Sequence, residues 1–344
     1  MKRTLSLFAL SMLTAGQGFC GYLEDGNAQL AKGDFDEAVV NFNKAIAQDQ
    51  NDCRAYVFRG YIRQTKGNLD DALADYNKAI EINPRYQLAY NNRGNVKSSK
   101  HDPAGALADF TMAIQLKPDY AEAYFNRGLT KANTGDTDGA IIDYSKAIEL
   151  NPGFAGAYYS RAIMKKKKGG LDGAILDLNR SIAIKGNDAF VYNSRARIKL
   201  AKGDFAGSLE DFSEAIKLNP NFAPLYNDRA WCEFLTKDFD NAIKDGTHGI
   251  QLDPKDGYGY STRGWARQEK GDMAGALTDC KMAVELIGTN SPASLGDQGM
   301  VDFINGDFKG AITLWEKTVQ HDASEKEVIA TWIEKAKARQ NISK

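Results

Sequence analysis

Charged side chains that recur at a constant spacing are the residues of this sequence best suited to chemistry. An arginine returns every 34 residues, and an aspartate follows each of these arginines by 16 residues. A column of guanidinium groups could bind an anionic ligand, whereas guanidinium–carboxylate pairs could hold each repeated segment together. The pairs are Arg59 and Asp75, Arg93 and Asp109, Arg127 and Asp143, Arg161 and Asp177, Arg195 and Asp211, Arg229 and Asp245, and Arg263 and Asp279.

Both charge columns stop together at the two ends of the repeated region. The corresponding positions hold Asp25 and Asn41 at the beginning, and Gln298 and Leu314 at the end. Pairing within each repeat matches every arginine with an aspartate, whereas pairing between neighbouring repeats leaves a charge unmatched at an end. We therefore predict structural salt bridges inside the repeats, with an anion-binding stripe as the alternative.

Cysteine and histidine, the usual nucleophiles and metal ligands, are few and scattered. The cysteines are Cys20, Cys53, Cys232 and Cys280, and the histidines are His101, His248 and His321. They form no CxxC pair and no metal-binding spacing, and the sequence contains no phosphate-binding loop, GxSxG elbow or HExxH motif. We predict no enzyme activity, no cofactor and no metal. The thiols are expected to be unpaired, with a Cys20–Cys53 bridge as the alternative in an oxidising compartment.

The overall charge indicates which partners to exclude. The 344 residues include 44 lysines and arginines against 45 aspartates and glutamates, for a formal net charge of -1. Such a balance creates no field that would draw the protein to nucleic acid. Hydrophobic residues make up 43% of the chain, which is ample for a packed structure. We expect a folded protein that does not bind nucleic acid.

The elements that carry the charge columns follow from the same period. Leu69, Ala72, Tyr76 and Ile80 are separated by three or four residues and form the apolar stripe of a second helix. Asp or Asn precedes this helix as an N-cap, and proline often follows it. A glycine lies just before each cap and suits a left-handed turn after a first helix. The column is Gly33, Gly67, Gly135, Gly169, Gly203 and Gly271, with His101 and Lys237 in two places and Gly306 one residue late.

The segment from Ala123 to Gly128, followed by Gly135, Asp136 and Ala140, resembles the tetratricopeptide repeat. The resemblance extends over residues 19–323, in units that start near residues 19, 53, 87, 121, 155, 189, 223, 257 and 292. It implies an all-α, right-handed superhelical solenoid of about nine helix-turn-helix repeats, whose first helices line the concave face.

Three columns bear on how the helices of these repeats meet. Small residues such as Gly94 and Gly128 on the first helix let the second helix approach, as the family requires. A further glycine column lies in the first turn of the second helix, where we expect close packing between neighbouring units; it comprises Gly105, Gly139, Gly173, Gly207, Gly275 and Gly310. One position that is often aromatic in the family is charged here, as Arg63, Lys97, Lys131, Lys165, Lys199, Glu233 and Arg267.

The resemblance makes the concave groove the expected site for a protein or peptide partner. Counting around the first helices places seven rings on or near it: Phe125, Tyr159, Phe190, Trp231, Phe234, Tyr258 and Trp265. Aromatic anchors suit an extended or helical peptide. Two alternatives remain, namely packing of these rings between repeats and stacking on a glycan. We predict a non-catalytic scaffold or adaptor, and we advance an envelope assembly, secretion or polysaccharide-export complex as its setting.

The first residues are typical of an export signal. Met1-Lys2-Arg3 is a basic start, and residues 5–15 form an apolar run that is too short to span a bilayer. Cleavage after Gly18 would leave residues 1–18 as the signal peptide, with cleavage after Ala15 as the alternative. A lipid anchor on Cys20 is disfavoured because Phe19 precedes it. We expect an exported protein, periplasmic or secreted, without a transmembrane span in the mature chain.

Residues 324–344 follow the last repeat. Val328, Ile329, Trp332, Ile333 and Ala336 form an apolar face on a helix that is expected to run from about residue 324 to residue 339. Repeat arrays need a terminal helix that covers their last hydrophobic face. We therefore predict a capping helix and a short tail, and docking of this helix onto another protein is the alternative.

Overall fold

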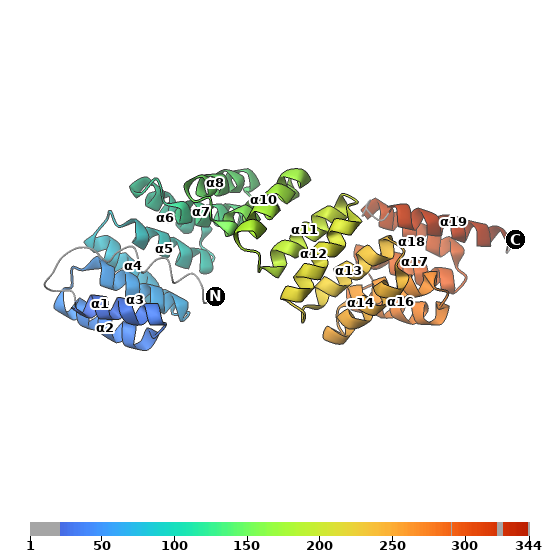
Figure 1. Ribbon diagram of the computed structural model, residues 1–344, viewed down its shortest axis with the longest axis horizontal. Coiled ribbons are helices and arrows are strands. Elements are labelled where there is room, and N and C mark those ends of the chain that lie inside the picture. Colours follow the sequence, from blue (N-terminus) through green and yellow to red (C-terminus); the bar gives the residue numbers. More distant parts are fainter. Residues whose placement is uncertain (1–20, 290, 322–325, 343–344) are drawn as a thin grey trace. The chain divides into compact units, whose positions relative to one another are not determined.

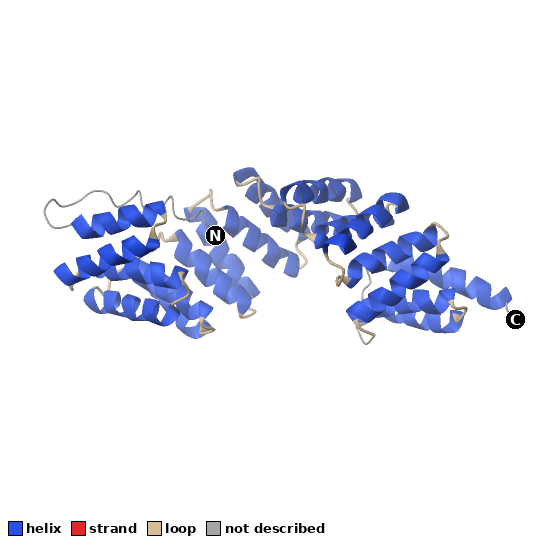
Figure 2. Cartoon of the chain, turned by 90° about the horizontal axis from the view of Figure 1, so that it is seen from below, coloured by secondary structure: helices blue, strands red, loops and turns tan. Residues whose placement is uncertain are grey.

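The computed structural model describes residues 21–289, 291–321 and 326–342, and every regular element in them is helical (Figures 1 and 2). The predicted all-α architecture of paired helix-turn-helix repeats is confirmed. The proposed signal peptide, residues 1–18, lies outside the described residues. The helices are α1 (Gly21–Lys32), α2 (Phe35–Gln48), α3 (Cys53–Thr65), α4 (Leu69–Ile82), α5 (Gln87–Ser99), α6 (Pro103–Leu116), α7 (Ala121–Asn133), α8 (Thr137–Leu150), α9 (Ala155–Lys167), α10 (Leu171–Ile184), α11 (Ala189–Ala201), α12 (Phe205–Leu218), α13 (Ala223–Leu235), α14 (Phe239–Leu252), α15 (Gly257–Glu269), α16 (Met273–Ile287), the short 3-10 helix η1 (Pro292–Ser294), α17 (Leu295–Ile304), α18 (Phe308–His321) and α19 (Lys326–Ile342).

The chain divides into two compact units, residues 1–165 and 166–344, with the boundary near the end of α9. Within each unit the odd-numbered helices up to α17 are the first helices of the repeats, and the even-numbered helices are the second helices. Each helix packs against the next one along the chain. Among the described residues, no helix is both long enough and apolar enough to cross a membrane.

The tight turn inside each hairpin requires a left-handed backbone residue. Gly135 adopts a φ angle of 89° at this position, and the two residues that replace glycine, His101 and Lys237, adopt 60° and 64°. The next residue caps the second helix, because Asp136 Oδ1 accepts a hydrogen bond of 2.9 Å from the amide of Gly139. The turn and the cap are therefore arranged as the sequence predicts.

The glycines in the first turn of the second helix have a local cause, and the predicted contact between neighbouring units is wrong for them. A Cβ atom on Gly139 would lie 2.1 Å from Oδ2 of Asp136, the N-cap of the same helix. The same overlap would arise between Gly105 and Asp102. Glycine at this position leaves room for the capping carboxylate.

A ring from the second helix packs against the bare backbone of the first helix in most hairpins. A Cβ atom on Gly94 would lie 2.7 Å from the Phe110 ring, and one on Gly128 would lie 2.8 Å from the Tyr144 ring. Both rings are buried. Burial of one such side chain stabilises the fold by about 1.5–3 kcal/mol. The small residues on the first helix therefore determine how closely the two helices approach, which fixes where the charged columns meet.

The helix α19 buries its predicted apolar face. Ile329, Trp332 and Ala336 are at most 1% exposed, and Val328 and Ile333 are half-buried against the same cluster. The backbone of α19 packs on α18. The fold of the second unit therefore includes a helix that is not part of a hairpin repeat.

Candidate functional site

The guanidinium and carboxylate groups of the two charge columns lie side by side within each repeat. In the fourth repeat, Arg127 Nη2 donates to Asp143 Oδ1 at 2.7 Å and Arg127 Nε donates to Asp143 Oδ2 at 2.9 Å. Asp143 is 1% exposed. The corresponding distances are between 2.5 and 3.0 Å for Arg59, Arg93, Arg195, Arg229 and Arg263. Arg161 and Asp177 belong to different units, and their pairing stays a prediction.

A second cation contacts the same aspartate, and sequence reasoning missed it. Lys131 Nζ lies 2.8 Å from Asp143 Oδ2. Equivalent contacts of 2.8 to 2.9 Å are made by Arg63, Lys97, Lys199 and Arg267. These are the positions that depart from the tetratricopeptide pattern. Their constant spacing of 12 residues before the aspartate was the available signal. Each buried carboxylate is therefore held by two cations, which offsets the cost of its desolvation.

The arginine also reaches the preceding repeat. Arg127 Nη1 donates to Thr111 Oγ1 on α6 at 3.2 Å, and the guanidinium lies 5.5 Å from the centre of the Tyr124 ring. Other repeats have the same Nη1 contact, of 2.6 to 3.2 Å, to Asn43, Asn77, Ser145, Asn179, Ser213 and Thr247. Since each of these guanidinium groups is engaged on three sides, we propose a structural role for the column over the anion-binding alternative.

One repeat breaks the pattern of the second cation. Glu233 stands in this column on α13, where its Oε1 lies 3.9 Å from Arg229 Nε and its Oε2 is buried without a hydrogen-bond partner. Burial, followed by the charge of Asp245, raises the pKa of Glu233 to about 8. This repeat therefore contains a carboxylate where its neighbours contain a cation, and that carboxyl group favours its protonated form.

The cysteines form no disulfide within the described residues. Cys53 is partly exposed, and Cys232 and Cys280 are buried, all with unpaired thiols. Burial raises the pKa of Cys232 to about 11, so this thiol stays protonated and unreactive at neutral pH. Cys20 lies outside the described residues. No group of three or more histidine, cysteine, aspartate or glutamate residues in the described chain is arranged to hold a metal ion.

The seven predicted groove residues fall into three groups of exposure. Phe190 and Tyr258 are 55% and 58% exposed. Phe125, Tyr159 and Trp231 are half-buried. Phe125 contacts Phe154 with ring centres 4.6 Å apart, and thus packs between successive repeats.

Phe234 and Trp265 form the third group, because each is only 5% exposed. The Trp265 indole nitrogen donates to Asp297 Oδ1 at 2.9 Å, and its ring lies 6.2 Å from that of Trp332 on α19. Phe234 packs 6.4 Å from Trp265 in the same cluster. The prediction that these two rings face an open groove is therefore corrected: they belong to the core of the second unit.

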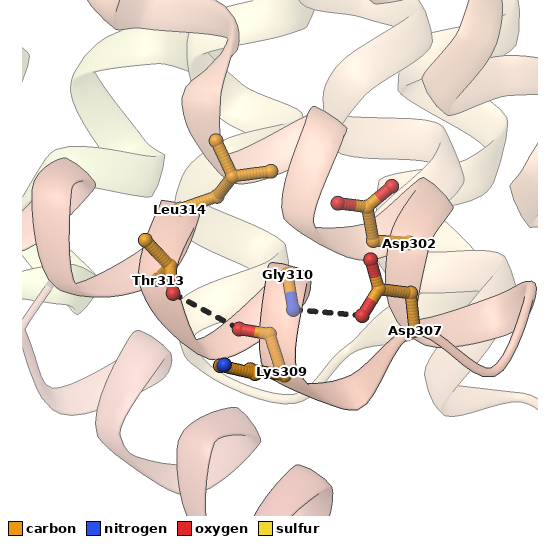
Figure 3. A pocket seen from close by; sticks show the side chains of 6 residues that line it. All are labelled: Asp302, Asp307, Lys309, Gly310, Thr313 and Leu314. Atoms are coloured by element: carbon orange, nitrogen blue, oxygen red, sulfur yellow. Dashed lines mark hydrogen bonds between the residues drawn. The ribbon is translucent and has the colours of Figure 1, made fainter.

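A cavity of about 370 Å³ lies in the last hairpin, between α17 and α18 (Figure 3). Asp302 and Leu314 line it and replace the second cation and the paired aspartate of the other repeats. Asp307 caps α18 by accepting from the Gly310 amide at 2.9 Å. Burial, followed by the charge of Asp307, raises the pKa of Asp302. The cavity therefore marks the end of the charge pattern.

Comparisons with known proteins agree with this architecture. Residues 60–99 match the family described as TPR repeat, and residues 121–154 and 193–257 match families described as tetratricopeptide repeat. A search of curated proteins finds no match to this sequence.

Solved structures with a similar fold include three helical-repeat proteins. The Cut9–Hcn1 hetero-tetramer of the APC/C is 17% identical with a TM-score of 0.57, over 83% of this chain and 56% of that one. PilF of Pseudomonas aeruginosa is 17% identical with a TM-score of 0.55, over 60% of this chain and 94% of that one. PilW, described as a type IV pilus biogenesis factor, is 21% identical with a TM-score of 0.55, over 60% and 96%. At these identities the likeness concerns the fold.

The paired helices, the repeated caps and the family matches together define an α-helical repeat protein. Within that class, this chain is a tetratricopeptide repeat protein, and its fold is that of a scaffold.

Proposed function

We propose that the protein binds a protein or peptide partner through the first helices of its repeats. The observation that carries this proposal is the pair of exposed rings in the second unit. Phe190 is the second residue of α11 and Tyr258 is the second residue of α15, so both occupy the same position of the repeat. Pro224 takes that position on α13 between them. An exposed aromatic stripe on a rigid array suits an anchor in a partner's surface.

We include export and the absence of catalysis in this proposal. Export is supported by the basic start and the apolar run of residues 5–15. A binding role needs no catalytic residues, and every described helix from α1 to α18 belongs to a hairpin repeat. An envelope assembly or secretion complex remains the hypothesis for the setting, because PilF and PilW support the fold alone.

The glycan alternative loses part of its basis. Stacking on sugar rings would need exposed Trp231 and Trp265, and Trp265 is buried beneath α19. Trp231 is half-buried and stacks on Phe234 with ring centres 5.3 Å apart. The peptide hypothesis is favoured because Phe190 and Tyr258 are exposed.

Affinity capture from an envelope extract tests the proposal. The bait is the chain from Phe19 onward, compared with the double variant Phe190→Ala/Tyr258→Ala. Ile142→Ala/Leu176→Ala is the matched control, since these side chains on second helices are 67% and 68% exposed. We expect the control to retain its partner and the Phe190/Tyr258 variant to lose at least about tenfold in capture, equivalent to about 1.4 kcal/mol. Equal capture by all three chains would refute the proposed surface.

A further inference from the structure

The C-terminal helix α19 lies on rings that come from three other helices. Trp332 of α19 is 5.4 Å from Phe303 of α17, 6.1 Å from Trp315 of α18 and 6.2 Å from Trp265 of α15, measured between ring centres. Trp332 is 1% exposed. Its ring is therefore inserted among aromatic side chains, which is the geometry of an anchor in a binding pocket.

Charged side chains border this aromatic contact. Lys335 Nζ lies 3.6 Å from the centre of the Trp332 ring and 3.3 Å from Glu269 Oε1 on α15. Arg339, one turn further, has its guanidinium 4.9 Å from the centre of the Phe303 ring. An apolar centre with a charged rim is typical of a docked amphipathic helix.

The contacts to α15 go beyond what a capping helix requires. A cap covers the exposed face of the last hairpin, which here is α17 and α18. Trp265 and Glu269 belong to the first helix of the preceding repeat and are four residues apart, so they lie on one face of α15. First helices are also the elements that the proposed function assigns to partner binding. The helix α19 therefore covers part of the first-helix face of its own array.

We propose that Trp265, Phe303, Trp315 and Glu269 form a receptor surface for an amphipathic helix, which α19 occupies within the same chain. The partner is a helix of the same chemistry: a tryptophan that enters the aromatic cluster, a lysine three residues later that meets Glu269, and a small residue four residues later, as Trp332, Lys335 and Ala336 provide. The partner must displace α19, so α19 acts as an intramolecular competitor. This inference rests on the proposed function for the class of partner, but it concerns a different surface from Phe190 and Tyr258.

A labelled peptide of residues 326–342 is the probe, and its affinity for full-chain variants is measured by fluorescence anisotropy. In the parent chain the tethered helix competes at a high effective concentration, so the peptide binds weakly. Lys335→Glu in the chain places a carboxylate opposite Glu269 and loosens α19. We expect this variant to bind the peptide at least about tenfold more tightly than the parent. Lys337→Glu is the control, because Lys337 pairs only within α19, with Glu334 at 2.9 Å.

A charge exchange makes the test specific to the contact with α15. The Glu269→Lys chain is expected to prefer a peptide carrying Lys335→Glu over the unchanged peptide by about tenfold, while the Lys335→Glu chain shows the reverse preference. Circular dichroism of each chain checks that the repeats remain folded. Absence of any peptide binding to both loosened chains, or binding without a charge preference, would overturn the receptor surface and leave α19 as a cap. Neither outcome depends on Phe190 or Tyr258, so the capture experiment can fail or succeed independently.

Discussion

A single arginine in each repeat uses its guanidinium donors in contacts with two different repeats. Arg127 shows the arrangement, because Nε and Nη2 donate to Asp143 of its own hairpin while Nη1 donates to Thr111 of the preceding one. The planar fork of arginine makes these contacts at once, and lysine could not replace it. The cost of burying Asp143 is offset only because Lys131 supplies a second positive charge.

Glu233 reverses this charge logic, and its effect on stability depends on pH. Its pKa in the folded protein is raised from 4.5 to about 8, so the folded state holds a proton that the unfolded chain has released between these values. Stability associated with this group is therefore complete below about pH 4.5 and declines as the pH rises toward about 8. We expect Glu233→Gln to raise the free energy of unfolding by about 2 kcal/mol at pH 8.5 and to change it little at pH 4.5.

Urea denaturation of the parent and Glu233→Gln proteins at the two pH values checks this expectation. Glu285→Gln serves as the control, because Glu285 is an exposed residue of α16 in the same unit. An equal gain at both pH values would show that the amide stabilises the fold by a route other than deprotonation of Glu233.

At the scale of the helix, the features that repeat were predictable and the one that does not repeat was not. The period of 34 residues predicted the hairpins, the left-handed turns and the Arg–Asp pairs, because each depends on residues close in sequence. The second cation was visible as a column, but its partner was not, since Asp143 had already been assigned to Arg127. The burial of Trp265 was missed because it depends on α19, whose contact with α15 joins Lys335 to Glu269 across 66 residues.

The two cations of one hairpin should act together on its stability. With either Arg127 or Lys131 present, the buried Asp143 retains a partner, so Arg127→Ala and Lys131→Ala should each cost about 1–2 kcal/mol. The double variant strands the carboxylate and should cost more than the sum of the two, by about 1 kcal/mol or more. A double-mutant cycle in urea measures the difference. Lys146→Ala, which removes an exposed pair with Glu149, should have almost no effect, and additivity of the first two changes would contradict a shared site.

Across the whole molecule, the charge contacts join each repeat to its immediate neighbour. Arg93 links Asp109 of its own hairpin to Asn77 on α4, and Arg229 links Asp245 to Ser213 on α12. An array held by such contacts has a stability made of single-repeat and nearest-neighbour contributions, so a defect weakens the structure locally. Only α19 departs from this rule, because it contacts a helix that precedes the last hairpin.

Local coupling predicts where amide hydrogens exchange faster after an arginine is removed. Arg93→Ala in the first unit should accelerate exchange in α4, α5 and α6 by about tenfold or more and leave α13 to α18 unchanged, because its lost partners lie on neighbouring helices. Arg229→Ala should do the converse, with faster exchange in α12, α13 and α14. Hydrogen exchange followed by mass spectrometry resolves these segments. Uniform acceleration across both units after either change would instead mean that the repeats open as one cooperative structure, and the nearest-neighbour account would then be wrong.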